Sequence, residues 1–254
     1  MIAARIRAMG SLQWLALYGV ILGAWGLLYA MALPADLRAA GAVYGLDLLA
    51  SLCVVAPDGS GYLGLVAMWA IMSAAMMAPT ALPAFAAYDD LSARAGGGFG
   101  ALLGGFLAIW LGFAVLAAGL QLALFQLGYL SVFGDSQSLV LSGLLLMLAG
   151  AYQFSALKAA CLTLCRAPLA FFMTHWAEGP WRNGLRLGAV CLGCCWALML
   201  LAFVGGVMNL AFMAVAMVLM ALEKLPAIGR HVTRPLGGAL MVSGAATLGF
   251  GLIG

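Results

Sequence analysis

The chain has 254 residues, of which 66% are hydrophobic and only 7% are charged. An ordinary soluble domain has about 25% charged residues, so this composition excludes a water-soluble globular protein. The net charge of +3 includes no basic tract of the kind that nucleic acids attract. We therefore predict an all-α polytopic transmembrane helix bundle, folded as a single domain over residues 1–254, with the lipid bilayer as its surroundings and no nucleic-acid partner.

Prolines, glycine runs and charged residues divide the apolar sequence into segments near the length of about 20 residues that one membrane crossing needs. The apolar stretch from Leu187 to Leu222 is too long for one crossing, and Gly205-Gly206 near its middle predicts a tight hairpin, with Asn209 as the cap of the helix that follows. The seven predicted spans are residues 11–33, 62–82, 99–127, 138–157, 187–204, 207–222 and 235–254.

The segments between these spans are predicted to lie at the membrane surface. They are residues 34–61, the Asp89-Asp90 region with its glycine run, and residues 158–186. If the N-terminus is cytoplasmic, every Lys and Arg except Arg38 falls on the cytoplasmic side. This bias predicts a multi-pass protein of the bacterial cytoplasmic (inner) membrane, with its N-terminus inside and its C-terminus outside.

Five of the six cysteines fall in two groups near the cytoplasmic ends of predicted helices, and Cys53 lies apart from them. Thiols stay reduced in the cytoplasm, and thiolates are soft ligands that favour Cu(I), zinc or an iron–sulfur cluster. Helical spacing places each group on one face of its helix. The alternative is that these cysteines are small apolar residues in a helix bundle. The candidate metal ligands are Cys161, Cys165, Cys191, Cys194 and Cys195.

Methionines form a second soft-ligand pattern. One stripe follows the second span through Met68, Met72 and Met76, with Met77 beside it. Another follows the sixth span through Met213, Met217 and Met220, and Met208 lies at the outer turn of the hairpin. Thioethers arranged in this way predict a path for a soft monovalent cation, although methionine also packs well between helices.

Few other polar residues lie within the apolar segments. Tyr152 and Gln153 are expected to form hydrogen bonds between helices. Glu223 and Lys224 are most simply a pair that extends to the membrane interface, and the alternative is that Glu223 is a carboxylate near the thiols that helps to transfer metal or protons. The chain has only two histidines and no phosphate-binding loop, so we predict that it is not an enzyme.

Four motifs resemble those of a bacterial family of seven-helix proteins known as predicted metal-binding integral membrane proteins. The matching positions are Met68, Trp69, Met72 and Met76 to Pro79, then Tyr152, Gln153, Leu157, Lys158, Cys161, Leu162, Cys165, Arg166 and Pro168, then Cys191 to Met199 with Gly206 and Met208 to Leu210, and finally Glu223, Lys224 and Pro226. Leu187 stands where the family often has a histidine, and Ser155-Ala156 replaces Thr-Pro.

The resemblance implies a metal-handling membrane protein, and the family has been linked to copper supply for tyrosinase-like oxidases. We therefore expect Cu(I) binding and delivery to a cuproenzyme, with zinc as the alternative ion. Two other functions are compatible with the residues. In the first, the cysteines form a thiol–disulfide component of a membrane oxidoreductase. In the second, the chain is a non-catalytic assembly subunit that uses its glycine-rich third and seventh spans for helix contacts.

Overall fold

The computed structural model describes residues 12–33, 59–95 and 98–253, so the predicted surface segment 34–58 and Cys53 lie outside the described residues. The described chain is all-α, apart from one isolated bridge between Leu130 and Ser136. Its helices are α2 (Leu12–Met31), α5 (Gly59–Thr80), α6 (Leu82–Ala95), α7 (Phe99–Gln126), α8 (Leu139–Tyr152), α9 (Ala156–Arg166), α10 (Pro168–His175), the short η2 (Trp176–Glu178), α11 (Gly179–Met199), α12 (Ala202–Gly205), α13 (Leu210–Lys224) and α14 (Gly229–Ile253).

Several long apolar helices indicate a multi-pass membrane protein, and the described residues contain fewer candidate spans than the seven predicted. Within the described residues, five helical segments are long and apolar enough to cross a membrane, or six if α8 and α9 form one bent span. The prediction of seven spans differs from this number because α13, the predicted sixth span, has only 15 residues, short of the roughly 20 that a crossing needs. The fourth predicted span also breaks early, since α8 ends at Tyr152 and α9 leaves at an angle of 61°.

Two segments predicted as surface connections are helical. The Asp89-Asp90 region belongs to α6, where the Asp89 carboxylate accepts hydrogen bonds from Gln13 Nε2 at 2.6 Å and Trp14 Nε1 at 2.8 Å, both on α2. Residues 158–186 form most of α9, α10, η2 and the start of α11. Tyr88 of α6 packs edge-on against Phe172 of α10 with ring centroids 5.1 Å apart. Contacts between these helices, which a hydropathy pattern does not show, explain the difference.

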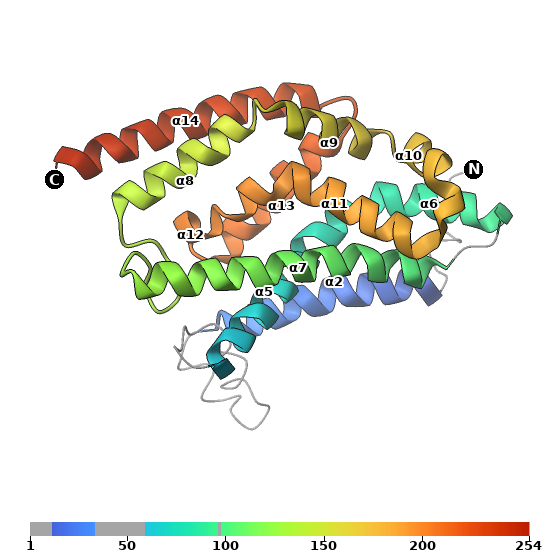
Figure 1. The fold of residues 1–254 in the computed structure, drawn as a ribbon, viewed down its shortest axis with the longest axis horizontal. Helices are drawn as coiled ribbons and strands as arrows, with labels where there is room; N and C mark the ends of the chain where they lie inside the picture. The colour runs from blue at the N-terminus through green and yellow to red at the C-terminus, as the bar shows by residue number, and fades with distance from the viewer. Residues whose placement is uncertain (1–11, 34–58, 96–97, 254) are drawn as a thin grey trace.

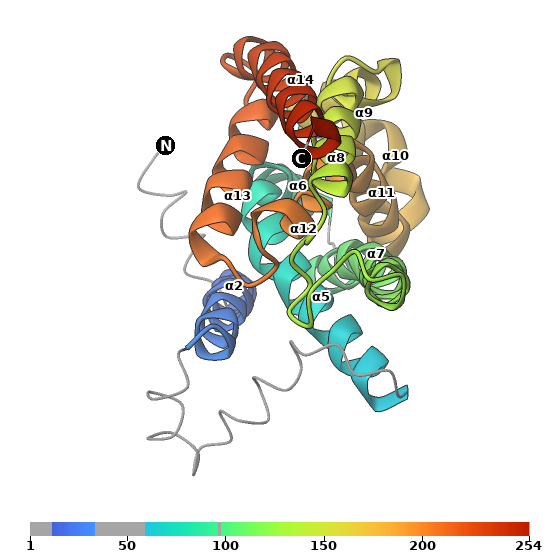
Figure 2. The same cartoon turned by 90° about the vertical axis from the view of Figure 1, so that its left-hand side faces the viewer.

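The helices pack as pairs around a buried centre (Figures 1 and 2). Helices α7 and α11 pack together, α5 packs on α7 with α2 beside it, and α8 and α14 form a pair on the far side of the molecule from α2. Glycines permit two of these close approaches. A Cβ atom on Gly105 of α7 would lie 2.9 Å from the Leu185 nitrogen of α11, and one on Gly150 of α8 would lie 2.8 Å from the Met241 nitrogen of α14.

The predicted hairpin in the long apolar stretch is confirmed. Helix α12 ends at Gly205, and Gly206 has a φ of +95°, which lies in the left-handed region that favours glycine. The predicted cap is also confirmed, because Asn209 Oδ1 accepts a hydrogen bond from Phe212 N at 3.1 Å. The hairpin sends α13 back along α5, with which it packs.

Candidate metal centre

The bend between α8 and α9 brings the two cysteine groups together. Ser155 begins α9 by accepting a hydrogen bond from Lys158 N at 3.1 Å, and α9 then packs along α11. Cys165 Sγ of α9 lies 3.9 Å from Cys194 Sγ of α11, and Cys194 Sγ lies 3.3 Å from Cys195 Sγ. Thiols that are 29 residues apart in sequence therefore meet in space.

Cys161 lies at the edge of the same cluster. A Cβ atom added to Gly193 would come within 2.6 Å of Cys161 Sγ, so this sulfur lies directly over the glycine of α11. Tyr152 confirms the predicted hydrogen bond between helices, because its hydroxyl donates to the carbonyl of that same Gly193. The hydrogen bond predicted for its neighbour Gln153 is absent, since neither Nε2 nor Oε1 of that side chain has a partner among the described residues.

The five thiols differ in burial. Cys191, Cys194 and Cys195 on α11 are 2%, 1% and 1% exposed. Cys161 and Cys165 on α9 are half-buried. The thiol cluster, which we define as Cys161, Cys165, Cys191, Cys194 and Cys195, thus has a buried side on α11 and an accessible side on α9.

The interpretation of Glu223 and Lys224 as an interfacial pair is wrong. Both are buried, with exposures of 1% and 8%, and they point to different partners. Lys224 Nζ donates to Cys191 Sγ at 3.0 Å and to Thr80 Oγ1 at 2.6 Å. The sequence pattern missed this lysine as a neighbour of the thiols, because hydropathy alone does not show that α13 ends against α11 and α5.

The Glu223 carboxylate forms a buried ion pair with a lysine of α9. Lys158 Nζ of α9 donates to Glu223 Oε2 at 2.8 Å, and both side chains are 1% exposed. The guanidinium of Arg166 donates through Nε and Nη2 to the Glu223 carbonyl at 2.9 and 2.7 Å. These contacts tie α9 to the end of α13 and so hold Cys165 against α11.

A cavity of about 210 Å³ opens beside the thiol cluster. It is lined by Cys165, Cys191, Met217 and Lys224, and Thr80 of α5 also belongs to its lining. Leu187 lines the same cavity. The soft donor atoms in the lining of this cavity are therefore the sulfurs of Cys165, Cys191 and Met217.

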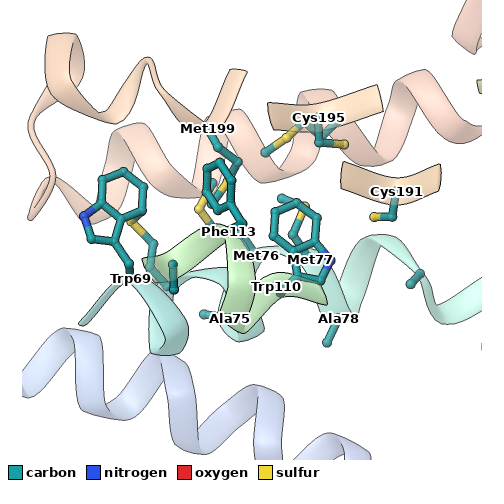
Figure 3. Close-up of a cluster of buried hydrophobic side chains, with 14 of the residues drawn as sticks. Trp69, Ala75, Met76, Met77, Ala78, Trp110, Phe113, Cys191, Cys195 and Met199 are labelled. Carbon is teal, nitrogen blue, oxygen red and sulfur yellow. The ribbon is translucent and has the colours of Figure 1, made fainter. Parts of the chain in front are cut away.

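The methionine stripe of the second span lies in the core. Met68, Met72, Met76 and Met77 are all at most 3% exposed. Figure 3 shows Met76 and Met77 between Trp69 and Cys195, together with Met199 of α11. Met199 was not among the sequence candidates, although its position one turn after Cys195 is a signal that could have found it.

Met208 takes no part in this arrangement. It lies in the α12–α13 turn, half-buried, at the other end of α13 from Lys224. Met213 and Met220 of the second stripe are buried, and Met217 faces the cavity. The two stripes are therefore close where α5 packs on α13, whereas the predicted outer member is separate.

The sulfur separations are compatible with a shared soft ion. Metal–sulfur bonds of about 2.3 Å let two sulfurs bind one ion when they are at most about 4.6 Å apart, and both measured separations are shorter. Among the described residues, no group of three or more His, Cys, Asp or Glu side chains converges in a geometry that could hold a metal ion. The described part of the chain therefore offers pairs of thiols rather than a closed cage.

Comparison with known proteins identifies the family of this chain. The family model described as PpoB2, copper chaperone, matches residues 66–247. The chain belongs to this family. No curated protein and no solved structure matches the chain significantly. The matched segment contains both cysteine groups and the methionine stripe of α5, and the predicted family resemblance is confirmed.

Membership of the PpoB2 copper chaperone family implies copper as cargo and a non-catalytic role. A chaperone passes its ion to a recipient, so the family also implies a copper-dependent partner protein. The soft sulfur ligands around α9 and α11 agree with that cargo, because thiolates and thioethers select Cu(I) over hard ions.

Proposed function

We propose that the protein binds Cu(I) at the thiol cluster, on the cytoplasmic side of the inner membrane, and passes it along the buried methionines to a cuproenzyme. The observation that carries this proposal is the meeting of Cys165, Cys194 and Cys195 across two helices, with sulfur separations of 3.9 and 3.3 Å. Two thiolates are enough for Cu(I), which accepts linear coordination. Neither an open third position nor a carboxylate ligand is needed.

The half-buried thiols of α9 are the entry side in this proposal. Cys161 and Cys165 receive the ion, and exchange of thiolate ligands moves it to Cys194 and Cys195 without a change of oxidation state. The protons of the bound thiols are released as the metal binds. The ammonium of Lys224, 3.0 Å from Cys191 Sγ, offsets negative charge that thiolates bring into the protein interior.

The buried methionines support the second half of the path. Cys191, Cys195 and Met199 follow one face of α11 at intervals of four residues. Met76 and Met77 of α5 lie next to this face (Figure 3). Thioethers are neutral, so an ion leaving the thiolates meets successively weaker ligands, which favours delivery over storage.

The decisive experiment measures copper in the detergent-purified full-length protein after loading with Cu(I) under reducing conditions. We expect about one copper per chain, in keeping with thiolate selectivity, and its loss in the triple variant C165S/C194S/C195S. The matched control is Cys53→Ser, which removes a thiol outside the two cysteine groups. A triple variant that binds as much copper as the wild type would refute the thiol site.

A second measurement separates delivery from binding. The variant M76L/M77L/M199L should load copper normally but release it more slowly to a Cu(I) chelator on the opposite side of a reconstituted vesicle. Met173→Leu is the control, because Met173 is 66% exposed on α10. Equal release from both variants would contradict the methionine path and leave the thiol cluster as a binding site alone.

The two alternative functions predict other results. A thiol–disulfide component would show a reversible loss of free thiols on oxidation and no stoichiometric copper. An assembly subunit would tolerate replacement of every cysteine. The glycines proposed for that scaffold role are partly occupied within the chain, since Gly105 of α7 contacts α11 and Gly244 of α14 contacts α8.

A further inference from the structure

A second cavity, distinct from the one beside the thiols, lies where the α8–α9 bend meets the start of α14. Its volume is about 350 Å³. Gly237 of α14 packs directly on Gln153 and Phe154 at the bend, and Figure 1 shows the start of α14 running over this corner. The polar residues lining the cavity are Gln153, Ser155, Thr163, Arg166, Arg230, Thr233 and Arg234.

Three guanidinium groups and no carboxylate line this cavity. Arg230 and Arg234 are exposed, lie one helical turn apart, and take part in none of the ion pairs between described residues. Arg166 uses Nε and Nη2 on the Glu223 carbonyl, and an arginine has five N–H donors in all. The nearby carboxylate of Glu223 is matched by Lys158, so the positive charge of the arginines is not offset.

Gln153 is the second and independent observation. It is 5% exposed, lines the cavity, and has no partner for either Nε2 or Oε1. Buried amides in native proteins almost always have partners, and Gln153 lies in the wall of the cavity, so a turn of its side chain would give the amide a partner in a group bound there. An oxyanion would accept from Nε2, and a hydroxyl on the same group would donate to Oε1.

One further donor is available. Ser155 Oγ accepts from Lys158 N at 3.1 Å, which leaves its own hydroxyl hydrogen free to point into the cavity. Thr163 and Thr233 instead donate to carbonyls of their own helices, at 2.9 Å in each case. The group in the cavity must therefore offer several acceptor oxygens to three guanidinium groups, one amide and one hydroxyl.

We propose that this cavity binds a phosphate group. Guanidinium groups recognise phosphate through pairs of parallel hydrogen bonds, and three of them suit a tetrahedral anion better than a planar carboxylate. The phosphate belongs either to the headgroup of an anionic phospholipid or to a phosphate compound in solution. The predicted cytoplasmic position of Arg166, Arg230 and Arg234 gives access to both sources.

The experiment uses the full-length protein and follows its thermal unfolding, since a ligand of the folded state raises the midpoint. One arm adds inorganic phosphate to protein in a neutral detergent, with sulfate-free chloride at equal ionic strength as the reference. The other arm compares nanodiscs of phosphatidylcholine alone with nanodiscs that also contain phosphatidylglycerol. A midpoint raised only in the first arm identifies phosphate in solution, and one raised only in the second identifies the lipid headgroup.

Variants show whether the effect belongs to this cavity. R230Q/R234Q should weaken binding in the responsive arm by about tenfold or more, because charge-assisted hydrogen bonds are the strongest ones the cavity provides. The matched control R182Q/R186Q removes the same charge from arginines that line a different hollow. Equal loss in both double variants, or no midpoint change in either arm, would overturn the proposal.

Gln153→Leu gives a test that does not depend on charge. Without a ligand this variant should be as stable as the wild type or more stable, because it removes an unpartnered buried amide. With the ligand its midpoint should rise by less than that of the wild type. A variant that keeps the full ligand shift would show that Gln153 is not part of the site and would contradict the assignment.

Discussion

Glu223 and Lys224 are adjacent in sequence, yet the regions around them differ in kind. Glu223 meets Lys158 in a buried ion pair whose formal charges cancel. Lys224 meets a thiol and a threonine hydroxyl, and among the described residues no carboxylate lies within ion-pair distance of it. One region has its charge matched by the protein alone. The other is matched only when sulfur carries the negative charge.

At the end of α13, one buried contact therefore stabilises the fold, and the other acts on the properties of a thiol. The Lys158–Glu223 pair holds α9 against α13, and replacement of both partners by apolar residues should be tolerated. The Lys224–Cys191 contact has no such substitute, because the properties of the sulfur depend on the neighbouring cation. Three substitutions test this distinction.

The largest effect is expected when the ion pair loses one partner. Glu223→Gln leaves a buried ammonium unmatched and should lower the free energy of unfolding by about 3 to 5 kcal/mol. Denaturant titration in detergent micelles measures this loss. The double variant K158M/E223M should recover most of the stability and bind copper like the wild type, and a double variant as unstable as the single one would contradict a purely structural role.

Lys224→Met should lower the free energy of unfolding less than Glu223→Gln does, but it should weaken copper binding more. Loss of the cation beside Cys191 is expected to weaken Cu(I) binding by about 10- to 100-fold, the usual effect of removing a group that supports a metal ligand. Competition with a chromogenic Cu(I) chelator measures the affinity. Lys224→Arg keeps the charge and serves as the control, and equal affinities for all three proteins would show that the lysine does not act on the thiols.

The smallest effect is expected at Thr80, which touches the second region only through Lys224. Its hydroxyl accepts from Lys224 Nζ at 2.6 Å and donates to the Met77 carbonyl at 2.9 Å. Thr80→Val should cost about 1.5 kcal/mol of stability and reduce copper affinity less than Lys224→Met. The control Thr247→Val, which removes a hydroxyl bonded to the Ser243 carbonyl in an exposed hydrogen bond, should change neither quantity measurably.

Hydropathy and local sequence signals predicted much of the fold. Gly206 and Asn209 marked the hairpin correctly, because a positive φ and a helix cap are properties of single residues. The span count was less reliable because a bend such as the one after Tyr152 depends on what the next helix packs against. Asp89 likewise resembled a loop residue until its two donors on α2 were known.

The candidate site divides in the same way. Spacing along each helix predicted that Cys161 and Cys165 share one face and that Cys191, Cys194 and Cys195 share another. Spacing could not predict that Lys224 reaches Cys191, because that contact joins residues 33 apart through the docking of α13 on α11. Nor could it distinguish the paired Glu223 from a free carboxylate.

The 61° bend between α8 and α9 also makes α9 a lever arm. Cys165 lies nine residues beyond the start of α9, about 14 Å along its axis, so a change of about 5° in the bend moves its sulfur by about 1 Å. The separation from Cys194 Sγ is only 3.9 Å, so such a swing would loosen an ion shared by the two thiols of the proposed site. In that site, a force that moves α9 would change how tightly the copper ion is held.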